Sequence, residues 1–444
     1  MRVTVIGAGY VGLVSGVCLA EAGHDVVCVD VSPDRVGRIL RGESPIHEEG
    51  LEPLLRTHLG KRFTATQDLA SAIRHSDLTL IAVGTPFDGT QIDLSHVRKA
   101  TEQIGLILRE KAAYHVVVVK STVVPGTTDS IVTPLLERTS GKLAGRDFGI
   151  GMNPEFLTEG QAVRDFMEPD RIVLGAADDR ALEVLEALYS PFPAVPKIRT
   201  NLRTAEMIKY VSNALLATAI SFSNEIANMC AALGEVDAVE VMRGLHLSNY
   251  LSVEGADGAR REAPITAFLL PGCGFGGSCL PKDVSALAAH GETLGAPMRL
   301  MHAVMAVNQN QPGQLLAQLE KHFPALEGLR VAVLGLAFKP DTDDVRESPA
   351  FPVIRLLLER QARVKAFDPV AMPAAREILG DTVAYATSLE SCLSDADAVL
   401  LVTRWKQFDA VPTLLAAMES PPLLVDGRRQ LDRWDVARYA AIGL

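Results

Sequence analysis

The first thirty residues carry the pattern that most restricts the fold of this chain. Residues 2–6 predict a strand, and Gly7-Ala8-Gly9-Tyr10-Val11-Gly12 follows it directly. An alanine-rich helical pattern then runs to Ala22, and residues 25–30 predict a second strand that closes on Asp30. A lone GxGxxG is weak evidence, but a strand before it, a helix after it and an acid at the next strand end predict a dinucleotide site.

Each glycine of this turn is expected to have a separate task. Gly7 allows the tight turn, Gly9 lets the backbone approach a pyrophosphate, and Gly12 lets the helix pack on the sheet. The helix N-terminus then receives the phosphate charge. Asp30 is expected to accept hydrogen bonds from a ribose 2′-hydroxyl and to repel a 2′-phosphate, which favours NAD over NADP. Arg35 either reaches the adenosine side or is a solvated helix residue.

Further apolar runs predict strands at 78–83, 116–119, 148–152 and 172–174, with a helical pattern at Ser95–Lys111 between two of them. Strands that alternate with helices predict a parallel sheet with right-handed crossovers, which binds ligands at the carboxyl ends of its strands. The polar residues at these ends are Thr85, Thr122, Asn153 and Glu155. Any one of them alone could be a turn residue, but four at matching positions favour a site.

Residues 201–235 contain no Pro or Gly until Gly234 and predict one long helix. At ~1.5 Å per residue such a helix would span roughly 45 Å, which suggests a connecting and dimer-forming element. Lys209 and Asn213 are four residues apart and therefore share one face. They indicate either a site on an otherwise apolar helix or a solvated stripe.

Four glycines crowd two cysteines in the stretch from Pro271 to Asp283. A helix is expected to begin at Pro281 or Lys282, and a thiol beside a lysine at a helix start has a lowered pKa. Cys279 is therefore either a nucleophile above a bound substrate or an incidental small residue. From this stretch alone, neither interpretation is excluded.

After this loop, helical patterns reach Gly291 and then Asn310, a break is expected at Gln311-Pro312-Gly313, and residues 324–328 resemble a linker. Strands predicted at 331–334, 364–368, 398–402 and 423–425 repeat the N-terminal pattern without a full GxGxxG. This degenerate repeat is not expected to bind a dinucleotide in the same way. Cations at its strand ends suggest a phosphate-bearing substrate, although each alone could be ordinary surface charge. They are Lys339, Arg346, Arg404, Arg428 and Arg429.

Bulk properties exclude several classes of protein. The 444 residues are enough for two or three domains, and a net charge of −11 without a basic run argues against a nucleic-acid surface. No apolar run approaches the ~18–20 residues that span a membrane, and the N-terminus does not resemble a signal peptide, so a cytoplasmic location is expected. No CxxC pair is present, so no metal is expected. Cys18, Cys28, Cys230 and Cys392 fit buried thiols in a reducing compartment.

Taken together, these motifs resemble the nucleotide-sugar 6-dehydrogenase family, which includes UDP-glucose and GDP-mannose dehydrogenases. The resemblance covers nearly the whole chain. Its motifs are Gly7–Gly12, Gly84-Thr85-Pro86, Lys120-Ser121-Thr122, residues 153–160, Pro169-Asp170-Arg171, Lys209 with Asn213, residues 276–283, residues 335–340 and residues 342–348.

The resemblance implies an α/β fold with two Rossmann-like doubly wound parallel-sheet domains, joined by a long central helix and a helical middle domain. The boundaries we expect are 1–200 for the NAD-binding domain, 201–312 for the helical middle domain with the Cys loop, and 325–444 for the nucleotide-sugar domain. It also implies two-fold oxidation of a sugar C6 hydroxyl to a carboxylate with two NAD, in a homodimer or higher oligomer. UDP-glucose is the expected substrate.

The residues that match the family motifs are assigned the following expected roles. The catalytic set is Cys279, Lys209, Asn213, Asp283, Glu159 and Thr122. The cofactor-binding set is Gly7, Gly9, Tyr10, Val11, Gly12, Asp30, Arg35, Thr85, Thr122, Glu159, Lys282 and Arg346. The substrate-binding set is Glu155, Phe156, Leu157, Glu159, Lys209, Asn213, Phe275, Gly276, Phe338, Lys339 and Arg428.

One segment departs from the family pattern. UDP-glucose members usually carry an Arg-Ile-Gly motif before the catalytic loop, where this chain has Pro264-Ile265-Thr266 after an extension at 253–258. Arg260 or Arg261 is a candidate substitute. Residues 168–171 favour a UDP-glucose enzyme, whereas residues 246–250 more loosely resemble the GDP-mannose branch, so another sugar nucleotide stays open.

Two other classes remain as alternatives. A two-electron hydroxyacid dehydrogenase would share the sheet and the long helix, but it would not need Cys279 or the cationic C-terminal domain. A catalytically silent NAD-sensing or assembly protein would not need Lys209, Asn213, Cys279 and Asp283 together. The number of NADH formed per substrate would distinguish the three classes: two for the four-electron enzyme, one for the two-electron enzyme and none for the silent protein.

Overall fold

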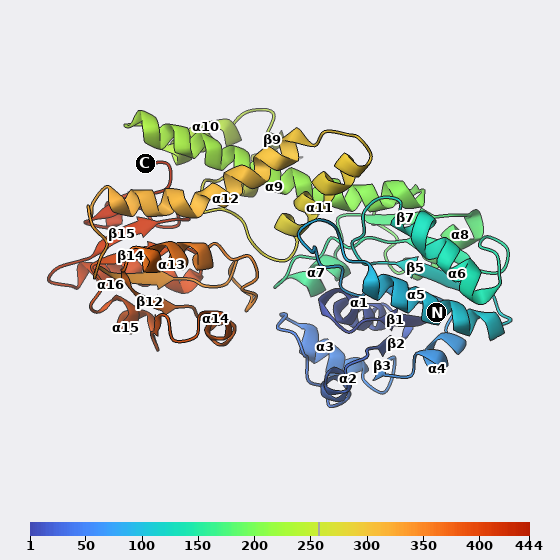
Figure 1. The fold of residues 1–444 in the computed structure, drawn as a ribbon. Coiled ribbons are helices and arrows are strands. Elements are labelled where there is room, and N and C mark those ends of the chain that lie inside the picture. The colour runs from blue at the N-terminus through green and yellow to red at the C-terminus, as the bar shows by residue number, and fades with distance from the viewer. Residues whose placement is uncertain (256–257) are drawn as a thin grey trace. The chain divides into compact units, whose positions relative to one another are not determined.

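The computed structural model describes residues 1–255 and 258–444, so Ala256 and Asp257 of the divergent extension lie outside the described residues (Figure 1). The chain divides into two compact units, Met1–Ser212 and Asn213–Leu444, here termed the N-terminal and C-terminal units. Their boundary falls inside the 32-residue helix α9, Leu202–Leu233, where the sequence predicts one long helix.

An eight-stranded sheet forms the middle of the N-terminal unit, in the order β3-β2-β1-β4-β5-β6-β7-β8. The strands are β1 (Arg2–Ile6), β2 (Asp25–Val29), β3 (Phe63–Thr66), β4 (Leu78–Ile81), β5 (Val116–Val119), β6 (Gly149–Met152), β7 (Ile172–Ala176) and β8 (Lys197–Thr200). Every strand predicted in this unit is present. The sequence patterns missed β3 and β8, which are four-residue strands at the two edges of the sheet.

The expected parallel pairing is confirmed from β3 to β6, but β6 and β7 pair antiparallel, contrary to the prediction. The connection between them contains only the six-residue helix α7, Ala162–Met167. The chain enters β7 near the carboxyl end of β6 and runs back beside it, so the two strands are antiparallel.

Helices cover both faces of this sheet, because alternate strand residues enter two separate cores. Val3 and Val5 pack with α1, whereas Ile6 packs with α5. The helices are α1 (Tyr10–Glu21), α2 (Pro33–Leu40), α3 (Leu51–His58), α4 (Leu69–Arg74), α5 (Ser95–Glu110), α6 (Thr133–Ser140), α7 (Ala162–Met167) and α8 (Asp179–Leu188). A buried apolar side chain contributes roughly 1.5–3 kcal/mol, so these two cores hold the strand ends in place.

The C-terminal unit begins with helices. These are the second part of α9, α10 (Ala238–His246), α11 (Leu280–Thr293) and α12 (Arg299–Glu320), with a short hairpin of β9 (Ser252–Glu254) and β10 (Arg260–Glu262). The helix break expected at 311–313 is wrong, because Pro312 lies inside α12. A proline in a helix interior costs about 3 kcal/mol, and the burial of Leu315, Leu316 and Leu319 in the core offsets it.

A second sheet follows in the C-terminal unit, with the order β13-β12-β11-β14-β15-β16 and parallel pairs throughout. Its strands are β11 (Arg330–Leu334), β12 (Arg363–Phe367), β13 (Ala384–Tyr385), β14 (Ala398–Leu401), β15 (Leu423–Asp426) and β16 (Tyr439–Ala441). Its helices are α13 (Ala350–Glu359), α14 (Met372–Leu379), α15 (Leu389–Leu393) and α16 (Val411–Ala416). This order matches β3-β2-β1-β4-β5-β6, so the predicted internal repeat is confirmed.

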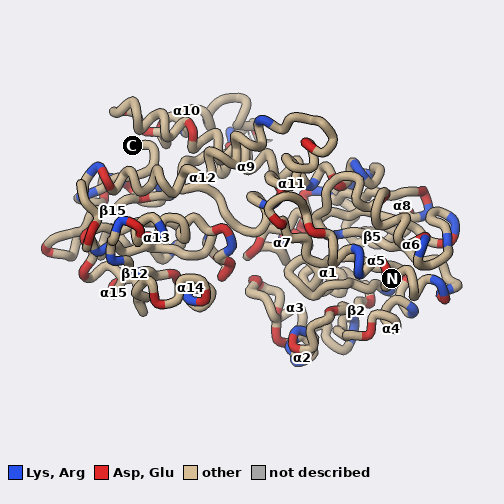
Figure 2. Tube along the Cα trace, viewed as in Figure 1, with Lys and Arg blue, Asp and Glu red and all other residues tan. Residues whose placement is uncertain are grey.

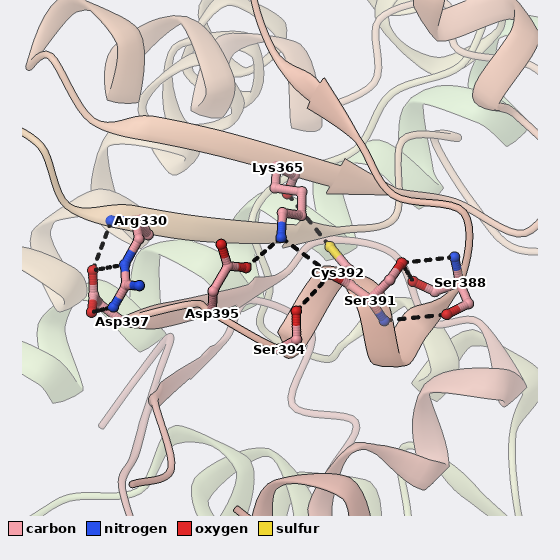
Figure 3. A network of polar contacts seen from close by, with 8 residues as sticks. All are labelled: Arg330, Lys365, Ser388, Ser391, Cys392, Ser394, Asp395 and Asp397. Atoms are coloured by element: carbon pink, nitrogen blue, oxygen red, sulfur yellow. Dashed lines mark hydrogen bonds and ion pairs between the residues drawn. The ribbon is translucent and has the colours of Figure 1, made fainter.

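The repeat extends to polar contacts at the amino ends of the strands. Arg330 at the start of β11 forms a forked ion pair with Asp397 before β14, with Nη2 2.6 Å from Oδ1 (Figure 3). In the N-terminal unit Arg2 and Asp77 form the same pair, also at 2.6 Å. Beside Arg330, Lys365 binds Asp395 and the carbonyl of Ser391 (Figure 3). These ion pairs lie at the amino ends of the strands. The ligand sites that the sequence predicts lie at the opposite, carboxyl ends.

Charged residues are mixed in sign within each unit. Lys and Arg are interspersed with Asp and Glu over the helices and loops (Figure 2). Within the described ranges, no helix combines the length and apolar character of a membrane span.

Candidate active site

The turn after β1 has the shape that its glycines predict. Gly7 has φ +101°, and a Cβ on Gly12 would lie 1.8 Å from the carbonyl oxygen of Gly7. A Cβ on Gly9 would meet no atom within 4 Å, so the space in front of the α1 N-terminus is open there. Helix α1 has no acid in its first turn. This geometry fits a pyrophosphate held by backbone amides and the positive end of a helix dipole.

Asp30 follows β2 and is buried beside this turn. Its carboxylate accepts hydrogen bonds from the amides of Ala8 (2.7 Å) and Ser32 (2.9 Å), and Arg35 Nη1 lies 3.0 Å away. Burial alone would raise the pKa of Asp30, but these amides and the guanidinium outweigh it and lower the pKa. Asp30 is thus an anion at the site where a dinucleotide ribose is expected, and Arg35 contacts it while keeping an exposed side.

The carboxyl ends of β4 and β5 are tied together. The Thr85 hydroxyl donates to the carbonyl of Thr122 at 2.7 Å, and the Ser121 hydroxyl donates to the carbonyl of Val83 at 2.7 Å. The structure therefore brings Thr85 and Thr122 together at one sheet edge, as their positions after parallel strands predict.

Lys209 and Glu155 form a buried ion pair in the N-terminal unit, with Nζ and Oε1 3.0 Å apart and side chains 4% and 7% exposed. Burial would raise the pKa of Glu155, but the ammonium of Lys209, the Leu157 amide and the ammonium of Lys120 together lower it. The Phe156 ring lies between cations, with the Arg171 guanidinium 4.0 Å and Lys209 Nζ 5.6 Å from its centroid. The Glu155 carboxylate thus places a negative charge directly beside the buried Lys209.

Lys120 is a second buried ammonium near this pair. Its Nζ donates to Asn153 Oδ1 at 2.9 Å, and burial lowers its pKa to about 8. Asn153 is held by Nδ2, which donates to the carbonyl of Val173 at 2.9 Å. The sequence patterns named Lys120 only as part of a motif, because burial of a lysine cannot be inferred from its neighbours.

Glu48 is a further residue that sequence reasoning missed. Its carboxylate is buried, accepts hydrogen bonds from the amides of Gly160 and Ala162, both at 2.8 Å, and also contacts the Tyr10 hydroxyl. This carboxylate ties the segment that contains Glu159 to the first turn of α1. A glutamate in the loop before α3 carries no signal of such a role without the tertiary contact.

In the C-terminal unit, Asn213 and Asp283 are hydrogen-bonded and buried. Asn213 Nδ2 donates to Asp283 Oδ2 at 2.6 Å, and Lys282 Nζ lies 2.5 Å from Asp283 Oδ1. Both carboxylate oxygens are thereby held. Cys279 is the N-cap of α11, and its carbonyl accepts a hydrogen bond from the Asp283 amide at 2.8 Å.

Of the six cysteines, all within the described ranges, Cys279 alone is exposed. Helix α11 begins at Leu280, one residue earlier than expected. A Cβ on Gly276 would lie 2.1 Å from the Glu347 carbonyl oxygen, and one on Gly277 would lie 2.7 Å from the Phe338 ring. The glycines before Cys279 therefore permit close packing against the segment after β11. Cys273 is buried, with Sγ 3.6 Å from the carbonyl oxygen of Val402.

A pocket of about 280 Å³ in the same unit is formed mainly by this loop and the strand ends of the second sheet. Phe275, Gly276, Phe338, Lys339 and Arg428 all line it, as does Arg404. Arg428 Nη1 donates to the Gly274 carbonyl at 2.8 Å, and Arg404 Nε donates to the Arg428 carbonyl at 2.8 Å. Burial, reinforced by Arg428, lowers the pKa of Arg404.

Two other cations expected at this edge are already engaged. Arg429 does not line the pocket, contrary to expectation, because its buried guanidinium pairs with Asp237 at 2.8 Å. Arg346 forms a forked, exposed pair with Asp344, with Nη2 2.6 Å from Oδ2. Among the described residues, no group of three or more His, Cys, Asp or Glu side chains is arranged to hold a metal ion.

Comparison with known proteins places the whole chain among nucleotide-sugar dehydrogenases. Residues 1–193 match the NAD binding domain of the UDP-glucose/GDP-mannose dehydrogenase family, residues 203–310 its central domain, and residues 332–433 its UDP binding domain. UDP-glucose 6-dehydrogenase AglM of Haloferax volcanii is 42% identical over 447 residues and covers 100% of both chains.

Two further proteins show the range of these similarities. GDP-mannose 6-dehydrogenase of Pseudomonas savastanoi pv. phaseolicola is 37% identical over 97% of this chain and 95% of its own length. A solved structure of a UDP-glucose dehydrogenase from Pyrobaculum islandicum has a TM-score of 0.90 and 39% identity, and covers 99% of this chain and 97% of its own.

Proposed function

The chain belongs to the UDP-glucose/GDP-mannose dehydrogenase family, and we propose that it oxidises the C6 hydroxyl of UDP-glucose to a carboxylate, with two NAD per sugar. Similarity over the full chain to a UDP-glucose 6-dehydrogenase supports this substrate. The observation that carries the four-electron reaction is the exposed thiol of Cys279 at the start of α11, one turn before Asp283. A two-electron dehydrogenase has no need of such a nucleophile.

The residues of the N-terminal turn fit NAD. The open space at Gly9 and the close approach of Gly12 to Gly7 favour a bound pyrophosphate, and the anionic Asp30 favours a free 2′-hydroxyl over a 2′-phosphate. When bound, NAD supplies the acceptor for the hydride that leaves C6. The other cofactor contacts that we propose are Tyr10, Val11, Arg35, Thr85, Thr122, Glu159, Lys282 and Arg346.

In the first oxidation the hydroxyl oxygen gives its proton to solvent water and the carbon C6 loses a hydride. We assign Lys209 to stabilise the developing alkoxide by its charge and Asn213 to donate a hydrogen bond to the same oxygen. The pairing of Lys209 with Glu155 supports this assignment, because it favours the charged ammonium despite burial. The Asn213–Asp283 bond orients the amide of Asn213, so that its position does not depend on the substrate.

In the second oxidation Cys279 is the nucleophile. Its thiolate adds to the aldehyde carbon to give a thiohemiacetal, which prevents release of the aldehyde. Loss of a second hydride from the carbon and of the hydroxyl proton gives a thioester, and hydrolysis by water then releases the acid and the thiol. Asp283 and Glu159 are the carboxylates that we assign to orient or deprotonate this water. Lys282 Nζ, 2.5 Å from Asp283 Oδ1, holds this carboxylate in place.

The sugar nucleotide is proposed to bind in the pocket beside the Cys loop. Its aromatic and apolar lining from Phe275 and Phe338 suits a base, and Lys339 and Arg428 supply positive charge for a diphosphate. The further substrate contacts that we propose are Glu155, Phe156, Leu157, Glu159, Lys209, Asn213 and Gly276.

Replacing the nucleophile tests this mechanism. Cys279→Ala is expected to abolish formation of the sugar acid, whereas some first oxidation can survive. The matched control is Cys273→Ala, a buried thiol outside the proposed chemistry, which should still make acid. Product mass spectrometry and NADH counting against a panel of UDP- and GDP-sugars give the measurement. Normal acid production by Cys279→Ala would contradict the mechanism, and a preference for a GDP-sugar would change the substrate.

A homodimer is the assembly that we propose. Exposed apolar side chains recur along α9 at Leu215, Phe222 and Met229, 55%, 47% and 60% exposed. Their seven-residue spacing forms a single stripe of the kind that pairs with another helix. A light-scattering mass of a single chain would contradict this.

We also propose a cytoplasmic location, which is supported by six cysteines without a disulfide in the described ranges.

A further inference from the structure

The loop that carries Cys279 is buried without being part of a helix or strand. Residues 271–277 are buried, and they precede the exposed Cys279. Backbone amides and carbonyls removed from water need hydrogen-bond partners, and an irregular loop cannot supply them internally. Side chains from α9 and α12 supply several of these partners.

Gly272 is held by two amide side chains that are fully buried. Its N–H donates to Asn224 Oδ1 at 2.8 Å, and its carbonyl accepts from Gln311 Nε2 at 2.8 Å. Gln311 Oε1 in turn accepts from Asn228 Nδ2 at 2.8 Å. This last contact fixes which end of the Gln311 amide faces the loop.

Phe275 is held by a single side chain at both of its backbone groups. Its N–H donates to Asn308 Oδ1 at 2.7 Å, and its carbonyl accepts from Asn308 Nδ2 at 3.0 Å. The amide of Asn308 thus pairs with the loop as a neighbouring strand would. Since one contact needs an acceptor and the other a donor, rotating the amide by 180° would break both.

The helix proline that the sequence patterns misread belongs to the same arrangement. Asn308 and Gln311 are three residues apart on α12 and share a face. Pro312 has no N–H to offer the carbonyl of Asn308, four residues before it. Gly274 packs against this turn, because a Cβ there would lie 2.8 Å from Asn308 Oδ1 and 3.4 Å from the Asn308 carbonyl oxygen.

We propose that Asn308 and Gln311 are positioning residues for the reaction, which fix the glycine-rich loop in its binding shape before the substrate arrives. The inference rests on the proposed function, because the loop lines the nucleotide pocket through Gly272, Gly274 and Phe275 and leads to Cys279. Two side chains on one helix thereby set both the pocket wall and the approach of the nucleophile. Neither residue needs to touch the substrate to have this effect.

The sharpest test is Asn308→Asp. This change keeps the size of the side chain and its acceptor for the Phe275 N–H, but it places an oxygen opposite the Phe275 carbonyl. Leaving that contact unmade should raise KM for the sugar nucleotide about tenfold or more, with a smaller change in kcat. The Phe275 carbonyl oxygen opposite the introduced carboxylate raises its pKa above the ordinary value. Because a protonated carboxyl can donate again, the defect relative to wild type should shrink as the pH is lowered from about 8 to about 5. A purely structural lesion would not be relieved by acid.

The matched control is Asn310→Asp, the same substitution two residues on, at an exposed position of α12. It should leave KM and its pH dependence unchanged. A second variant, Gln311→Glu, keeps the acceptor for Asn228 and removes the donor to Gly272, so it tests the proposal if Asn308→Asp fails to fold. Thermal unfolding of each variant identifies those with a native-like fold.

A readout without substrate separates this proposal from the proposed function. The rate at which iodoacetamide alkylates Cys279 should change at least about threefold in Asn308→Asp or Gln311→Glu and stay unchanged in Asn310→Asp. Folded variants with the wild-type alkylation rate and the wild-type KM would overturn the positioning role. If the wild type oxidised no sugar nucleotide but the alkylation rates still differed, the proposed function would fail and the positioning of the loop would stand.

Discussion

The two sheets share a strand order and diverge at the edge that binds ligands. At the amino ends of the strands, Arg2–Asp77 and Arg330–Asp397 form the same forked pair with the same 2.6 Å contact. At the carboxyl ends, α1 begins at Tyr10, three residues after Gly7, whereas α13 begins only at Ala350, fifteen residues after Gly335. The two sheets are therefore alike at the amino ends of their strands and differ at the carboxyl ends.

The acids that follow β2 and β12, Asp30 and Asp368, show how the carboxyl ends differ. Asp30 keeps an exposed arginine as a partner, while Asp368 accepts from the amides of Leu336 and Ala337 and from Trp405 Nε1 at 3.0 Å. In the first sheet we propose that this carboxylate binds a ribose, whereas in the second sheet the indole of Trp405 lies against the equivalent acid. The same strand order therefore binds a dinucleotide in one unit, and we propose that it binds a nucleotide sugar in the other.

The largest expected effect comes from adding one methyl group to either turn. Gly12→Ala would push a Cβ to within 1.8 Å of the Gly7 carbonyl oxygen, and Gly335→Ala would push one to within 2.4 Å of Thr403 Cβ at φ +95°. At such short approaches overpacking costs about 3 kcal/mol or more, so affinity should fall at least about a hundredfold. Gly12→Ala should weaken NAD and spare UDP, and Gly335→Ala should do the reverse, as measured by calorimetry with each ligand.

The control for this pair is Gly37→Ala, where a Cβ would meet only the Arg41 guanidinium at 3.5 Å. It should leave both affinities unchanged. If either turn variant weakened both ligands equally, the two edges would not be independent sites and the comparison would break.

A smaller effect is expected from neutralising the two acids. Asp368→Asn replaces a carboxylate surrounded by N–H donors with an amide that must point its own N–H₂ at one of them. A hydrogen bond to a charged group is worth about 1.5–3 kcal/mol, so the loss of one should cost the C-terminal unit about 1.5 kcal/mol of unfolding free energy. Asp30→Asn should instead cost about 1 kcal/mol of stability and lower NAD affinity about tenfold.

Hydrogen exchange of β11 and β12 against β1 and β2 measures the two stabilities separately, and calorimetry gives the NAD affinity. Equal destabilisation of both sheets, with NAD binding intact in Asp30→Asn, would show that Asp30 is as structural as Asp368. That result would remove the functional half of the comparison.

The sequence predicted the features that depend on short-range pattern. The glycine turn, the acid at Asp30, the long helix and the Cys loop are each encoded within about thirty residues, and the structure places them as expected. The internal repeat could also be predicted from the sequence, because buried parallel strands appear there as continuous apolar runs. The edge strands β3 and β13 lack such runs, since a strand at the sheet edge needs fewer apolar residues.

What the sequence did not reveal depends on partners far along the chain. From its sequence position Arg429 is predicted to be a ligand-binding cation. In the structure it pairs with Asp237, nearly two hundred residues earlier in the chain. Pro312 predicts a helix end, but the helix continues, because packing of the buried leucines after it outweighs the lost hydrogen bond. The roles of Asn308, Gln311 and Glu48 are in the same category, because amide and carboxylate side chains are informative only beside the backbone that they bind.

The smallest effect sharpens the comparison through pH. Lys120 directly follows β5 in the first sheet, while the matching strand β15 is followed by Gly427 and Arg428. An arginine does not lose its proton. Burial lowers the pKa of Lys120 from 10.5 to about 8. Between these values the unfolded chain holds a proton that the folded protein has released, so raising the pH stabilises the fold.

The expected gain is about 1 kcal/mol between pH 8 and pH 9, and it belongs to the N-terminal unit alone. Lys120→Met removes the titrating group and should remove this rise, when the difference from wild type is followed by hydrogen exchange of β5 and β6. Strands β14 and β15 serve as the internal control, because this proton does not act on them. Parallel stability curves for wild type and Lys120→Met would mean that Lys120 stays charged in the fold, and the two strand ends would then differ in side-chain geometry rather than in protonation.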